Sequence, residues 1–250
     1  MEVKCVGDMS VAKITSKLFY PCAMLTEMEE DGEIPDGSAA AYSFFYHVSR
    51  VATMAHQYAC YYELGKETEN LYYKSGLLHD FGKLGDKDLI RMWATQKRLR
   101  GMKREKVRWG HVDKNNFRKG LEIAGINAKP MFDEIRLVAL YHHVRNSVGQ
   151  DNYPDIHPKR LPKIVTVIGI IDAFEAIIST LRPYNKKNGE KYLCSNSMKP
   201  ITWTQAIKRL SKDVEAGKFE EKLFWEVSEA LTSAVPLSIV HLPNLLGHYV

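Results

Sequence analysis

The segment that most constrains the fold is Lys163–Thr180, the most apolar stretch of the chain. It follows Pro162 and reads Ile-Val-Thr-Val-Ile-Gly-Ile-Ile-Asp-Ala-Phe-Glu-Ala-Ile-Ile after its first lysine. Such a run also suits a buried strand, but its length and the preceding proline favour a helix. We therefore expect a helix in the core of the domain.

Asp172 lies in the middle of this segment. An unpaired carboxylate in such surroundings would be strongly destabilising, or would be forced to stay protonated. A metal ion or a cationic side chain would remove that penalty. We favour the metal over an internal ion pair.

The rest of the pattern is helical as well. Ala39–Tyr62 contains no proline or glycine and repeats apolar residues at helical spacing. Further helices are predicted at Val11–Tyr20, Glu67–Leu78, Leu89–Arg100, Val107–Ala124, Phe132–His143, Thr202–Lys212 and Phe219–Leu231. Little of the sequence alternates in the manner of a strand, so the predicted fold class is an all-α bundle.

A chain of 250 residues suits one large domain with short flanking segments. Residues 1–38 are predicted to be an N-terminal extension and linker, because Glu29–Ser38 is acidic and contains glycine and proline. Residues 39–232 are predicted to form the domain. The apolar tail, residues 233–250, is expected to pack on the domain or against a partner.

Composition indicates a cytoplasmic protein. No apolar run approaches the roughly 18 residues of a membrane-spanning helix, and Met1–Ser10 lacks the apolar core of a signal peptide. The four cysteines, Cys5, Cys22, Cys60 and Cys194, form no CxxC pair and are expected to be reduced. A net charge of +5 favours anionic partners only mildly. Neither a nucleic-acid polymer nor a membrane is therefore an expected partner.

Histidines and acids recur at the ends or buried faces of the predicted helices. In chain order they are His47, His79, Asp80, His111, His142, His143 and Asp172. Singly, His47 suits a core side chain and His79-Asp80 suits a solvated helix end. Together, five imidazoles and two carboxylates match a two-metal site, in which each ion takes about three or four protein ligands and one carboxylate is shared.

This ordered pattern resembles that of the HD superfamily of metal-dependent phosphohydrolases, and most closely its HD-GYP branch. That branch combines a His-His pair, a Gly-Tyr-Pro loop, an apolar helix bearing an aspartate, and Arg-Pro-Tyr. The corresponding features here are His142-His143, Asn152-Tyr153-Pro154, Ile170–Ala176 and Arg182-Pro183-Tyr184. The resemblance extends over most of the chain, so the implied architecture is an HD-domain helical bundle.

The resemblance implies that Asp80 bridges two divalent metal ions. The other six ligands divide equally, with His47, His79 and Asp172 on one ion and His111, His142 and His143 on the other. The implied metals are iron or manganese, with magnesium, nickel or zinc as alternatives. The pair of ions would activate a hydroxide for attack on a phosphodiester.

The activity implied by the resemblance is hydrolysis of a cyclic dinucleotide, with cyclic di-GMP as the first expectation. Asp80 and Lys83 are the residues expected to act in catalysis. Lys83 and Arg182 are also the expected phosphate clamps, since lysine supplies a point charge and arginine a bidentate fork. Tyr153 would stack on a guanine or form a wall of the pocket.

Three positions differ from the HD-GYP branch. Asn152 replaces a glycine, Val144 replaces a glutamate, and Ser43 stands where some members have a third-metal glutamate, so two metals are expected. The changed loop leaves open an HD phosphohydrolase for another nucleotide or phosphate ester. The basic run Lys97–Arg108, either a solvated face or a phosphate-attracting rim, and the apolar tail leave open a non-catalytic nucleotide-binding adaptor. A homodimer or a regulatory protein partner would suit any of these.

Overall fold

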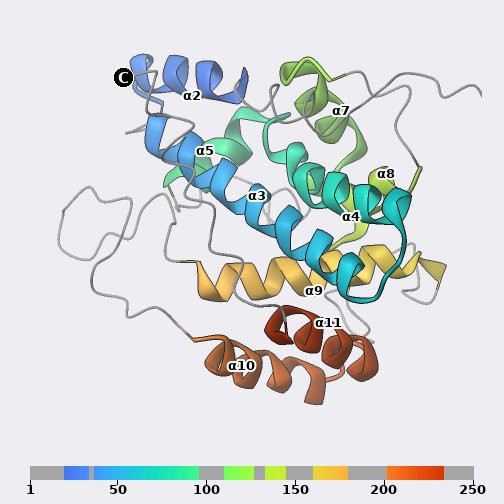
Figure 1. Ribbon diagram of the computed structural model, residues 1–250. Helices are drawn as coiled ribbons and strands as arrows, with labels where there is room; N and C mark the ends of the chain where they lie inside the picture. The colour runs from blue at the N-terminus through green and yellow to red at the C-terminus, as the bar shows by residue number, and fades with distance from the viewer. Residues whose placement is uncertain are drawn as a thin grey trace, which may run out of the picture.

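The computed structural model describes residues 20–33, 37–95, 110–126, 133–144, 160–179 and 202–233. Every regular element within these ranges is a helix (Figure 1), which confirms the all-α fold class. In chain order the elements are α2 (Tyr20–Glu30), α3 (Gly37–Tyr61), α4 (Lys66–Leu78), η1 (Phe81–Lys83), α5 (Lys87–Thr95), η2 (Gly110–Val112), α7 (Lys114–Ile123), α8 (Asp133–Tyr141), α9 (Lys163–Ile178), α10 (Trp203–Glu215) and α11 (Glu221–Ser233).

The pair of α3 and α4 organises the packing. α3 contacts α2, α4, α9 and α11 along its length, and α4 returns beside it. Gly76 of α4 makes this approach close, because a Cβ atom at that position would lie 2.5 Å from the Cα atom of Ala52. The two helices therefore meet backbone to backbone near the point where α4 ends.

The predicted core helix is α9. It begins after Pro162, and its residues Ile168, Ile170, Ile171 and Phe174 are fully buried. In Figure 1 it lies between the pair of α3 and α4 and the pair of α10 and α11, and it contacts all four helices. A second apolar cluster joins α2, α5, α7 and α8 to the other face of α3 and α4. This cluster includes Phe81 and Leu84, which follow α4.

The N-terminal part of the structure differs from the sequence-based prediction. A helix, α2, extends into the segment predicted to be a linker, and its Leu25 and Met28 are fully buried. These residues lie three apart, which places them on one face of α2 against α3. The helix predicted at Val11–Tyr20 lies outside the described residues except for Tyr20. The domain boundary after residue 38 stays a prediction.

Two further predicted helices are longer than the helices of the structure. Val107–Ala124 is not one helix, because Asp113 takes an extended conformation and its carboxylate accepts hydrogen bonds from the Asn115 and Asn116 N–H groups. This cap starts α7 and leaves His111 in the short helix η2. Likewise α8 ends at Tyr141, so the His142-His143 pair lies just beyond its end.

Several predicted features lie outside the described residues: the basic run Lys97–Arg108, Asn152-Tyr153-Pro154, Arg182-Pro183-Tyr184 and most of the apolar tail. Among the helices that the structure describes, none combines the length and apolarity needed to cross a membrane.

Candidate metal centre

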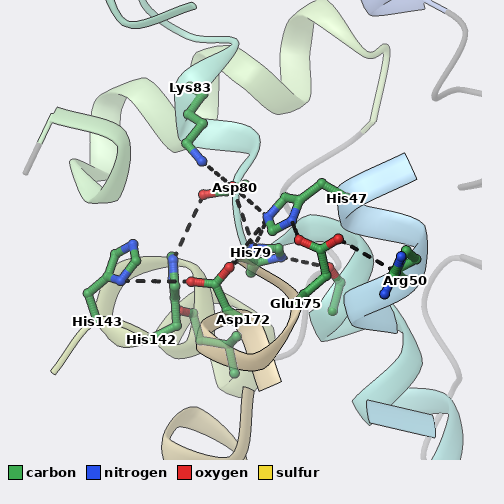
Figure 2. A network of polar contacts seen from close by, with 11 residues as sticks. His47, Arg50, His79, Asp80, Lys83, His142, His143, Asp172 and Glu175 are labelled. Carbon is green, nitrogen blue, oxygen red and sulfur yellow. Dashed lines mark hydrogen bonds and ion pairs between the residues drawn. The ribbon is translucent and has the colours of Figure 1, made fainter. Parts of the chain in front are cut away.

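The structure brings together the seven residues singled out by the sequence. They come from α3, the turn after α4, η2, the turn after α8, and α9. We call this group the His–Asp cluster; its members are His47, His79, Asp80, His111, His142, His143 and Asp172. Figure 2 shows most of these side chains converging on one small volume.

The turn after α4 places two members of the cluster. His79 is the C-cap of α4 and Asp80 precedes η1, so both project beyond the helix end. η2 packs directly on this turn, since a Cβ atom at Gly82 would lie 1.7 Å from the His111 carbonyl oxygen. Only glycine permits this contact, which carries His111 to the cluster.

One half of the cluster centres on His47. Its Nε2 atom lies 3.2 Å from His79 Nε2, 3.2 Å from Asp80 Oδ2 and 3.4 Å from Asp172 Oδ1. His79 Nε2 lies 3.5 Å from Asp80 Oδ2 and 3.8 Å from Asp172 Oδ1. Four potential ligand atoms therefore face one another, and they belong to the four residues that the resemblance assigns to one ion.

The other half contains His111, His142 and His143. The ring centroid of His111 lies 5.9 Å from that of His142 and 4.9 Å from that of His143. Asp80 Oδ1 lies 3.9 Å from His142 Nε2, and Asp172 Oδ2 lies 3.9 Å from His143 Nδ1. Both carboxylates thus turn one oxygen toward each half, whereas the sequence assigned that position to Asp80 alone.

Hydrogen bonds fix the orientation of three imidazoles. His79 Nδ1 donates to the Gly76 carbonyl at 2.7 Å, and His142 Nδ1 donates to the Val138 carbonyl at 3.0 Å. His47 Nδ1 lies 2.6 Å from Glu175 Oε2. A ring that donates through Nδ1 keeps its Nε2 lone pair for a metal, and this arrangement is usual for metal-ligating histidines.

Sequence reasoning missed Glu175 and Arg50. Glu175 is 1% exposed, and its second oxygen, Oε1, lies 3.5 Å from Arg50 Nε. Figure 2 shows Glu175 and Arg50 on the side of His47 that is opposite to His142 and His143. A signal was available, because Glu175 is a second acid in the apolar core helix, one turn after Asp172.

The charges of the two halves differ. Burial disfavours the charged imidazolium of His47, but the carboxylates of Asp80 and Glu175 outweigh that effect and raise its pKa from 6.5 to about 9. Burial lowers the pKa of His111 to about 4 and that of His142 to about 3. At neutral pH His47 therefore carries a second proton, whereas His111 and His142 are neutral.

Both carboxyl groups are held in the ionised form. Burial would raise the pKa of Asp80, but Lys83, His79 and His47 together hold it well below its usual value. Burial opposes ionisation of Asp172 too, and His47 and His79 lower its pKa. Two anionic carboxylates with several imidazoles form a donor set suited to divalent metals.

The residues present fit metal ions. Three groups bring their ligand atoms within 4.8 Å of one another: His47, His79 and Asp80; His111, His142 and His143; and His79, His142 and Asp172. Asp80 Oδ1 and His111 Nε2 are buried and have no hydrogen-bond partner among the described residues. Buried polar atoms are seldom left this way, and a metal ion would satisfy both.

The predicted substrate contacts are described only in part. Lys83 Nζ forms an ion pair with Asp80 Oδ2, and the Lys83 side chain is 19% exposed. It therefore borders the His–Asp cluster, and its roles in catalysis and phosphate binding stay predictions. Arg182 and Tyr153 lie outside the described residues, and their roles stay predictions.

Comparison with known proteins adds a family. Residues 44–177, more than half of the chain, match the family described as the HD domain. This range includes all seven residues of the His–Asp cluster and Glu175. Searches of curated proteins and of solved structures gave no match. HD domains bind divalent metals and are typically metal-dependent phosphohydrolases, and this chain belongs to the HD domain family.

Proposed function

We propose that this chain is a phosphodiesterase of the HD-GYP kind, which binds two divalent metal ions and hydrolyses a cyclic dinucleotide, cyclic di-GMP first. The observation that carries the proposal is the position of Asp80 between the two halves. Its Oδ2 atom lies 3.2 Å from His47 Nε2, and its Oδ1 atom lies 3.9 Å from His142 Nε2. A carboxylate in this position can be shared by two ions.

Each residue of the His–Asp cluster then has a role as a ligand or as an orienting group. Bound iron or manganese would supply a lowered pKa for water and positive charge beside the phosphate. His47, His79 and Asp172 would hold one ion, and His111, His142 and His143 the other. Since Asp172 also faces both halves, it would stabilise the pair of ions together with Asp80.

Lys83 would bind the phosphate. In the structure its ammonium group pairs with Asp80. Metal ions on Asp80 would compete for the same carboxylate and leave the ammonium group to a phosphate oxygen. Arg182 would add a bidentate contact, and Tyr153 of the Asn152-Tyr153-Pro154 loop would stack on a base.

The test is turnover by the purified full chain loaded with Mn²⁺ or anaerobically with Fe²⁺. We expect cyclic di-GMP to be opened to the linear dinucleotide, as followed by liquid chromatography. Lys83→Met should raise KM for the dinucleotide strongly while leaving metal content at about two ions per chain. Metal-loaded protein that cleaves no cyclic dinucleotide would overturn the proposal.

A second candidate is hydrolysis of another nucleotide or phosphate ester. Asn152 in place of the branch's glycine favours it, because the side chain alters the loop expected to contact the base. A panel of cyclic dinucleotides and nucleoside monophosphates separates the candidates by kcat/KM. The non-catalytic adaptor remains a third candidate, and it predicts ligand binding with no product under any metal.

A further inference from the structure

A second group of metal-ligating side chains lies away from the His–Asp cluster. His56 and Cys60 stand four residues apart on α3, so they share one face of that helix. Glu69 lies in the first turn of α4, which packs beside α3 (Figure 1). We call these three residues the Cys60 cluster.

The donor atoms of the Cys60 cluster are close together. Cys60 Sγ lies 3.6 Å from His56 Nδ1 and 3.8 Å from His56 Nε2, and His56 Nε2 lies 4.0 Å from Glu69 Oε2. One ligand atom from each residue fits within a span of 4.8 Å. Bonds to zinc of about 2.0 to 2.3 Å at tetrahedral angles need donors about 3.3 to 3.7 Å apart. Small side-chain rotations would therefore close the site around one ion.

We propose that the Cys60 cluster is a separate site for a thiophilic divalent ion, zinc first, with a water molecule as the fourth ligand. One sulfur, one imidazole nitrogen and one carboxylate oxygen form a donor set that zinc accepts. The His–Asp cluster contains no sulfur, so the two sites prefer different metals. On binding, the S–H bond of Cys60 is replaced by a sulfur–metal bond, and the proton goes to the solvent.

The present partners of the three residues do not block an ion. Lys66 Nζ lies 2.9 Å from Glu69 Oε2, but the Lys66 side chain is 88% exposed. Such a surface ion pair is weak and gives way to a divalent ion. The His56 ring packs edge-on against Tyr73, with centroids 6.0 Å apart, which holds the imidazole over α4. Cys60 is exposed, so an ion can enter from solvent.

An ion here would link the start of α4 to α3. The same two helices carry His47 and the His79-Asp80 pair nearer their other ends. His56 follows His47 by nine residues, or about 14 Å along the helix axis. The ion is therefore too distant to act on a substrate, and it would stabilise the helix pair that positions half of the His–Asp cluster.

Co²⁺ is the probe, because its thiolate complexes absorb in the near ultraviolet, whereas His and Asp ligands give no such band. The full chain titrated with Co²⁺ should show this band, with an intensity at saturation that corresponds to one thiolate-bound ion per chain. Cys60→Ser should abolish it and leave the metal content of the His–Asp cluster unchanged. Glu69→Gln should weaken Co²⁺ binding at the Cys60 cluster by about tenfold or more.

The matched control replaces Cys5, Cys22 and Cys194 with serine, so that Cys60 is the remaining cysteine. This variant should keep the thiolate band, and Zn²⁺ should raise its thermal stability by more than that of Cys60→Ser, in which only the His–Asp cluster is left to bind the ion. Absence of the band in the wild-type chain would overturn the proposal. So would its persistence in Cys60→Ser or its loss in the three-cysteine variant, with folding checked by circular dichroism.

Discussion

The two halves of the His–Asp cluster are built from similar side chains, yet the pKa values of their imidazoles differ. Three carboxylates lie within 3.4 Å of the His47 ring, and they raise the pKa of His47 to about 9. Burial opposes the charged form of His111 and His142 as well, but there the carboxylates do not outweigh it, and both pKa values fall to about 4 or below. The number of carboxylates beside each ring therefore decides its protonation. His47 must lose a proton to bind a metal, whereas His111 and His142 are neutral beforehand.

The largest expected effect comes from replacing Asp80, whose carboxylate faces both halves. Asp80→Asn keeps the shape of the side chain but removes the charge that faces both His47 and His142. We expect metal content and turnover to fall together, beyond the roughly 10–100-fold loss typical of groups that only orient a ligand. Elemental analysis and the dinucleotide assay measure the two losses.

Asp133→Asn is the control for this substitution, because Asp133 is an exposed residue whose partner is the surface Arg136. It should leave metal content and turnover unchanged. If Asp80→Asn retained both metals, Asp80 would not be the shared ligand, and Asp172 would have to take that place.

Next in size is the loss of one half at a time. His142→Ala removes an imidazole from the half that contains His111 and His143. Metal content should fall from about two ions to about one per chain, because only the half around His47 then has a complete set of ligands. His47→Ala should give the same stoichiometry through loss of the other ion. Mass spectrometry of the intact metal-loaded protein counts the ions, and an unchanged count in either variant would contradict the division into halves.

Sequence pattern was sufficient to single out the residues that the structure brings together, and to predict the helices on which, or beside which, most of them lie. α9 was predictable because an apolar run of this length after Pro162 suits a buried helix better than a strand. Asp172 within that run required a cationic partner or a metal ion. The sequence placed the His142-His143 pair in the last turn of a predicted helix, and the structure places it just beyond the end of α8.

What the sequence could not supply depends on neighbours distant in the chain. Glu175 contacts His47 across 128 positions, and no local pattern reports that contact. His111 was assigned to a helix interior because the capping role of Asp113 went unnoticed. Asp172 turns its second oxygen toward His143 because α8 packs on α9, and residue spacing does not predict that contact.

A smaller effect is expected from Glu175→Gln, which keeps a hydrogen-bond acceptor but removes the charge behind His47. The affinity for Mn²⁺ of the half around His47 should fall by about 10–100-fold, and the affinity of the half that contains His111 and His142 should not change. A purely structural role would leave the His47 pKa in the metal-free protein unchanged, whereas we expect that pKa to fall, as read by NMR. The exposed Glu215→Gln is the control, and equal loss in both halves would argue against a local effect.

The smallest effect is a difference in pH dependence between the halves. Below pH 9 the metal-free His47 is protonated, so each ion bound to its half displaces one proton, and affinity should rise by about tenfold per pH unit up to that value. His111 and His142 are already neutral above pH 4, so metal binding to these two rings releases no proton near neutral pH. Calorimetric titration of Mn²⁺ into His142→Ala isolates the first half, and titration into His47→Ala isolates the second. Proton release, which appears as a buffer-dependent enthalpy, should be larger in His142→Ala than in His47→Ala, and equal release in both variants would show that the halves do not differ.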